Sequence, residues 1–217
     1  MRGRNILRIM LGFATLQLAM PNLASAQAVT GWTEKQAAHR TELFARLTAE
    51  HFDKTSTLKD DDLETVATIT TAPGFTFKGG FTDRVRADSF LRAFIEKTTG
   101  RTSYQLYATI TYTGQWRTFE SGTFSTPAGP VSQPLTVIDH SVTCPYSICV
   151  YTEVVALELT ESFLRQLAQR ADERPVTPWR FRFKAKDSED WTDDIAPAEA
   201  AGLLLAVDRY RTAHRLP

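Results

Sequence analysis

The chain has 217 residues, of which 42% are hydrophobic, and its 25 basic and 25 acidic residues balance at neutral pH. A chain of this length can bury a sizeable core as one domain. Without residues 1–26 the chain is slightly acidic and has no electrostatic footprint for nucleic acid, so we expect no nucleic-acid partner.

Residues 1–26 have the pattern of a secretory signal peptide. Three arginines precede an apolar stretch at 9–20, and small residues at 24–26 suit cleavage. This stretch is too short for an ordinary membrane-spanning helix, and no later stretch is long and apolar enough for one. We expect residues 27–217 to form a single mature domain, with 22 basic and 25 acidic residues, in the periplasm or outside the cell.

The N-terminal part of the mature chain is expected to mix helices and strands. Apolar residues at helical spacing follow a capping-box pattern, which predicts a helix at 33–52. Residues 65–71 and 75–78 alternate as strands around a Pro-Gly break and could pair as a hairpin. The apolar residues of 83–97 fall on one helical face, which predicts a second helix that covers the core.

The strongest strand pattern lies at 104–116, with a continuation through 117–125. Tyr112 belongs to the alternating set expected on one face, and Tyr107 belongs to the opposite set. The proline- and glycine-rich residues 126–130 are expected to end regular structure.

Cys144 and Cys149, the two cysteines of the chain, stand at the ends of a short turn between two runs rich in β-branched residues, 135–143 and 150–159. Cysteines in an oxidising compartment most often pair, so we predict a β-hairpin closed by a disulfide. Closing so short a loop removes little chain entropy, and the bond is expected mainly to fix the register.

Pairing of the cysteines across the hairpin predicts the facing residues. Antiparallel strands in this register place three pairs on one face: Val142 with Tyr151, His140 with Glu153, and Ile138 with Val155. Because this face is the more apolar, we expect it to contribute to the core, with the histidine and glutamate in it or at its rim.

The C-terminal part is predicted to hold a helix, a strand and a final helix. Thr160 can cap the first helix, and 179–186 alternates between apolar and cationic residues as a strand does. The five acids of 187–194 predict a solvated turn and a helix start rather than a metal site. The final helix carries an apolar stripe at Leu203, Leu204, Val207 and Tyr210.

These elements predict an α+β fold with one disulfide across a hairpin. We expect an antiparallel sheet, with a sandwich or a half-barrel as curved alternatives, covered by amphipathic helices. Motifs of serine hydrolases, nucleotide-binding enzymes and zinc proteases are absent from the sequence, and the cysteine spacing is not that of a thioredoxin-like site. No cofactor and no metal are predicted.

Two functions remain open. We favour a non-enzymatic, exported binding or envelope-accessory protein, with a protein or a small molecule as partner, because the special residues serve caps, turns and a disulfide. The alternative is a small-ligand receptor or a hydrolase-type enzyme with an aromatic groove and two polar anchors. The candidate ligand-binding residues are His140, Glu153, Tyr151, Tyr107, Tyr112 and Trp116.

Overall fold

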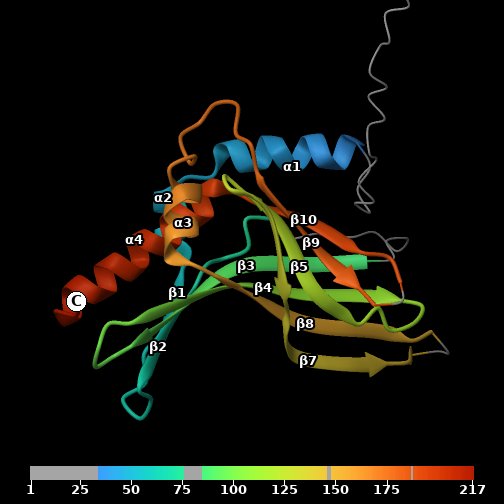
Figure 1. Cartoon of the computed structure of the whole chain (residues 1–217), viewed down its shortest axis with the longest axis horizontal. Coiled ribbons are helices and arrows are strands. Elements are labelled where there is room, and N and C mark those ends of the chain that lie inside the picture. Colours follow the sequence, from blue (N-terminus) through green and yellow to red (C-terminus); the bar gives the residue numbers. More distant parts are fainter. Residues whose placement is uncertain (1–33, 76–84, 146–147, 187) are drawn as a thin grey trace, which may run out of the picture.

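The computed structural model describes residues 34–75, 85–145, 148–186 and 188–217. Within them the chain forms two antiparallel sheets and four helices, an α+β fold (Figure 1). The predicted signal peptide and the strand predicted at 75–78 lie outside this part, apart from Phe75.

The larger sheet has the strand order β1-β2-β3-β4-β8-β7, and the smaller has the order β10-β9-β5-β6. The strands of the larger sheet are β1 (Thr57–Lys59), β2 (Val66–Thr70), β3 (Val85–Glu96), β4 (Thr102–Thr113), β7 (Thr136–Thr143) and β8 (Val150–Leu159). The strands of the smaller sheet are β5 (Phe119–Thr126), β6 (Gly129–Pro134), β9 (Trp179–Ala185) and β10 (Trp191–Ile195). The helices are α1 (Glu34–Arg46), α2 (Ala49–Thr55), α3 (Glu161–Ala168) and α4 (Pro197–His214).

The two sheets share one hydrophobic core. Alternate residues of β4 are buried, as their pattern predicts, and so are the aromatic residues of β9. The close approach of the sheets is visible at Gly122 of β5, where a Cβ would lie 2.7 Å from Leu157 Cδ1 of β8. A glycine at this point therefore lets β5 rest directly on the larger sheet.

Helices α2, α3 and α4 gather at one end of the molecule (Figure 1). A Cβ at Gly202 of α4 would lie 2.4 Å from Phe52 Cβ, so only glycine allows α2 to pack this closely. Thr160 caps α3, as predicted, by accepting a hydrogen bond from the Phe163 amide at 3.2 Å. None of the helices in the described part of the chain is long and apolar enough to cross a membrane.

The helix predicted at 83–97 is wrong, because Val85–Glu96 is the central strand β3. Its buried residues are Ala87, Ser89, Leu91, Ala93 and Ile95, which alternate along the strand. The opposite face carries the half-buried Phe90 and Phe94. With apolar residues on both faces, the segment also fits a helical stripe, and its pairing with β2 and β4 decides between the two.

Three other predicted boundaries also need correction. The helix expected at 33–52 is divided into α1 and α2, and Thr48 caps the second by accepting from the His51 amide. The acidic turn expected at 187–194 contains strand β10. Strand β6 lies where residues 126–130 were expected to end regular structure, because they form the turn of a hairpin with β5.

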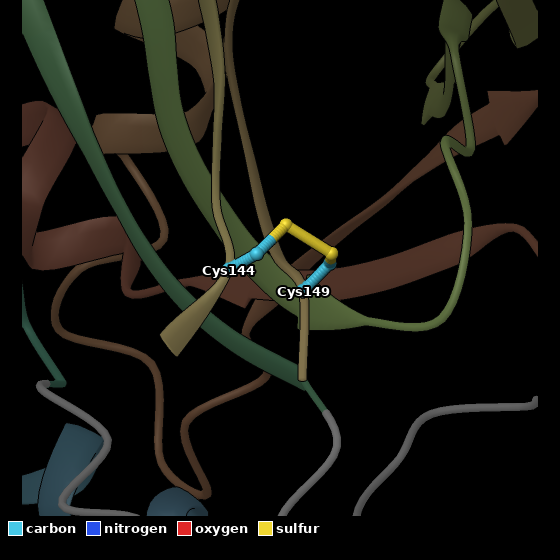
Figure 2. Close-up of a disulfide and its surroundings, with 2 residues drawn as sticks. All are labelled: Cys144 and Cys149. Atoms are coloured by element: carbon cyan, nitrogen blue, oxygen red, sulfur yellow. A yellow bond between two sulfur atoms is a disulfide. The ribbon is translucent and has the colours of Figure 1, made fainter. Parts of the chain in front are cut away.

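The disulfide between Cys144 and Cys149 is confirmed, with the two Cα atoms 3.9 Å apart (Figure 2). The predicted facing pairs Val142 with Tyr151 and His140 with Glu153 are also confirmed.

The third predicted pair is wrong, because a β-bulge at Ile138 shifts the register and places Val137 opposite Val155. The expectation that this face of β7 belongs to the core is wrong as well. All eight residues of β7 are exposed, because β7 is the edge of the larger sheet.

Candidate functional site

Five of the six candidate residues lie together at the disulfide end of the larger sheet, and Tyr107 does not. Tyr107 points to the opposite face of β4, where its ring is 5.0 Å from the Phe90 ring and 3.8 Å from the Arg92 guanidinium carbon. Adjacent residues of a strand point to opposite faces, so Tyr107 cannot share a groove with Tyr112.

Four side chains form what we call the aromatic patch: Tyr112, Trp116, His140 and Tyr151. Tyr112 of β4 and Tyr151 of β8 face each other across the sheet with stacked rings 5.9 Å apart. Trp116, from the loop between β4 and β5, lies edge-on to the Tyr151 ring at 4.9 Å and to the His140 ring at 5.5 Å.

The patch runs from the core to the surface. Tyr112 is buried, Tyr151 is half-buried, and Trp116 and His140 are exposed. Five of the ten large apolar side chains that the described residues expose lie on the disulfide hairpin and the neighbouring loop: Trp116, Val137, Ile138, Val142 and Ile148. A concentration of exposed apolar groups at one place marks an interaction surface better than scattered ones do.

Glu153 lies beneath the patch and is only 5% exposed. Its carboxylate accepts hydrogen bonds from the Tyr112 hydroxyl and from two backbone amides, those of Thr118 and Phe119, each at 3.0 Å. The Tyr112 hydroxyl in turn accepts from the Arg117 amide at 2.9 Å. These bonds satisfy a buried charge and fix the loop that carries Trp116.

The loop needs such support because Thr118 has a φ of 54°. A β-branched residue is strained in this left-handed region, and such strain persists only where the surroundings hold it. Burial and the Glu153 carboxylate also raise the pKa of Tyr112, which keeps its hydroxyl a donor.

His140 and Glu153 lie opposite each other in the register of β7 and β8. The ion pairs of the described residues do not include one between these two side chains. Both oxygens of Glu153 are engaged by the chain itself, so this carboxylate does not orient the imidazole as a general base would require.

A buried polar cluster, which the sequence did not reveal, lies away from the patch. Asp193 of β10 pairs with Arg40 of α1 and accepts from the Ser89 hydroxyl at 2.8 Å. Glu199 of α4 accepts from the Thr71 hydroxyl at 2.7 Å. These residues were missed because acids at a turn and in the first turn of a helix usually lie in solvent.

Glu199 is fully enclosed, and its Oε1 also accepts from the Leu91 amide at 3.0 Å. Burial raises the pKa of this carboxyl to about 8. Burial likewise raises the pKa of Asp193. Because Glu199 is not exposed to solvent, we regard the cluster as a structural link between α1, β3, β10 and α4.

Two hollows in the described part of the chain contain none of the six candidate residues. One, of about 330 Å³, lies beside Arg40 and Arg180, and the other, of about 240 Å³, lies between β1 and α4. Within the same residues, no group of three or more His, Cys, Asp or Glu side chains is arranged to hold a metal ion.

Comparison with known proteins gives no relative from which a function could be transferred. No protein-family model matches the chain, and no curated protein or solved structure matches it significantly.

Proposed function

We propose that the chain is an exported, non-enzymatic binding protein and that the aromatic patch is its recognition surface. The observation that carries this proposal is the exposure of five large apolar side chains on the disulfide hairpin and the neighbouring loop, next to the buried core that the two sheets share. Export is supported by the sequence pattern of residues 1–26 and by the pairing of the two cysteines, which persists in oxidising compartments.

The chemistry of the patch suits a partner that is apolar with a few polar groups. Trp116 and Tyr151 offer flat rings with little conformational entropy to lose, and aromatic residues often dominate binding energy. His140 adds a hydrogen-bonding group at the rim. The Glu153 hydrogen bonds hold the loop in place before binding, which lowers the cost of ordering it.

The fluorescent dye 8-anilinonaphthalene-1-sulfonate, which brightens on exposed apolar surface, can test the proposal. We expect the folded protein to bind the dye and Trp116→Ser to lose at least half of the fluorescence. Leu205→Ser on α4, which removes an apolar side chain of 46% exposure far from the patch, is the matched control. Equal fluorescence of both variants and the parent protein would contradict a binding role for the patch.

A screen with ester, peptide and glycoside substrates tests the non-enzymatic part. We expect no turnover above that of His140→Gln. Turnover that disappears in this variant while the fold is retained would instead support the hydrolase alternative.

A further inference from the structure

The four sheet edges differ in how they are protected. β1 has only three residues, and β6 contains Pro130 and Pro134, which have no amide to donate. The strand β10 is itself mostly buried, and Arg40 Nη2 of α1 donates to its Asp194 carbonyl at 2.6 Å. A short strand, prolines and burial by other parts of the chain keep an edge from pairing with another chain.

β7 is the long edge that lacks these three kinds of protection in the described part of the chain. It has eight residues, contains neither proline nor lysine, and is exposed along its whole length. Its bulge at Ile138 leaves a regular run from Asp139 to Thr143. Along this run the backbone groups that point away from β8 are available to another strand.

The side chains of this run differ between the two faces of the sheet. His140 and Val142 lie on the face of the aromatic patch, and Val142 is 47% exposed. Asp139 and Ser141 lie on the outer face. Asp139 forms no ion pair with another described residue, and it lies in one row across the sheet with Val154, Thr109 and Asp88.

A second copy of the chain does not complement this edge. Two-fold pairing of β7 with itself keeps the faces of the sheet aligned, so Asp139 would face an outer-face residue of the other β7. None of these residues is basic. A foreign strand with a basic residue at this position and apolar residues on the other face matches the edge in both charge and polarity.

We propose that β7 binds an extended polypeptide segment by strand addition, with a basic residue opposite Asp139 and apolar residues against His140 and Val142. This inference rests on the proposed function, because the apolar residues of the segment would lie beside the aromatic patch. The disulfide at the end of the hairpin holds β7 in register for such pairing.

The probe is a dansyl-labelled peptide, Thr-Val-Thr-Val-Lys-Val-Thr-Val-Thr, in which polar and apolar residues alternate. A second peptide has glutamate in place of lysine. A third has N-methyl groups on its valine and lysine nitrogens, which removes backbone donors that strand pairing needs. By fluorescence anisotropy, we expect the lysine peptide to bind at least fivefold more tightly than the glutamate peptide, and the methylated peptide not to bind.

Two variants locate the binding. Asp139→Lys changes an exposed side chain and should reverse the preference, so that the glutamate peptide binds more tightly. Glu158→Lys makes the same charge change on the same face of β8, beyond the paired end of β7, and should leave the preference unchanged.

Several results would overturn the inference. One is a lack of binding by the lysine peptide, and another is binding that ignores N-methylation or Asp139→Lys. A dimer of the protein in sedimentation that Asp139→Lys dissociates would assign the edge to a second copy instead. If strand addition fails but the Trp116-dependent dye signal remains, the proposed function stands and the patch binds another apolar partner. If both fail, both are wrong.

Discussion

Glu153 is a buried carboxylate whose partners all belong to its own chain. Its two oxygens accept from Tyr112, Thr118 and Phe119, and these bonds fix the loop between β4 and β5. In the proposed function, this acid would shape the recognition surface by holding a strained loop, without itself touching the partner. Trp116 therefore owes its position to a residue of β8 that follows it in sequence by more than thirty positions.

We predict that Glu153→Gln destabilises the protein by about 2 kcal/mol, because a charge-assisted acceptor is replaced by an amide whose NH₂ group faces a backbone amide. Urea unfolding measures this change, and dye binding at Trp116 should weaken with it. Glu158→Gln on the same strand, where the side chain is exposed, is the control and should change stability little. Equal stability of the two variants would show that the Glu153 bonds contribute nothing.

At the scale of elements, β7 is held in the larger sheet by one neighbouring strand and by the disulfide. It pairs with β8 on one side, and β8 in turn pairs with β4, which is buried on its inner face. An edge strand with no buried residue can loosen without disturbing the core. The bond between Cys144 and Cys149 therefore matters more for the alignment of this strand than for global stability.

Replacing both cysteines by serine should lower the free energy of unfolding by only about 2 kcal/mol or less, because the closed loop is short. The amides of β7 should nevertheless exchange with deuterium much faster, while those of β4 keep their protection. Hydrogen exchange with mass spectrometry compares the two strands in one experiment. Equal loss of protection in β4 and β7 would show that the disulfide supports the whole sheet.

At the scale of the whole molecule, the buried cluster around Glu199 makes stability depend on pH. The pKa of this carboxyl is raised from 4.5 to about 8, first by burial. Between these values the folded chain keeps a proton that the unfolded chain releases, so stability falls as the pH rises through this window. Each pKa unit corresponds to about 1.4 kcal/mol, so the loss amounts to several kcal/mol.

Glu199→Gln should remove this dependence, because a neutral amide has no proton to lose. Chemical unfolding at several pH values between 5 and 9 should give a flatter stability curve for the variant, with a gain over the parent protein that grows up to pH 8 and is largest above it. The groups that act on Glu199 are Thr71, Leu91, Asp193 and Arg40. Since Asp193 also has a raised pKa, some slope should remain. Parallel curves would contradict the prediction.

The sequence predicts best what depends on neighbouring residues. Alternation, spacing and local hydrogen bonding predict the disulfide hairpin, two of its facing pairs, the inner face of β4 and the Thr160 cap. Segment 83–97 could not be assigned in this way, because apolar residues on both faces satisfy a strand and a helix equally. Its pairing with β2 and β4 settles the matter.

The candidate site was predictable only in part for the same reason. The opposition of His140 and Glu153 follows from local register. The groups that donate hydrogen bonds to the Glu153 carboxylate come from residues 112–119. The sequence of β8 alone does not specify these donors. The edge position of β7 likewise depends on the strand order of the sheet, which no single segment encodes.

The hydrogen bond between α1 and β10 has a consequence for how the chain acquires its fold. Arg40 and Asp194 are 154 positions apart, so their hydrogen bond joins the first helix to the last strand. Contacts between residues so far apart in the sequence form slowly, because the long intervening loop must lose conformational entropy before the contact can stabilise the fold. A nascent chain would therefore emerge almost completely before its first helix could form this hydrogen bond with β10.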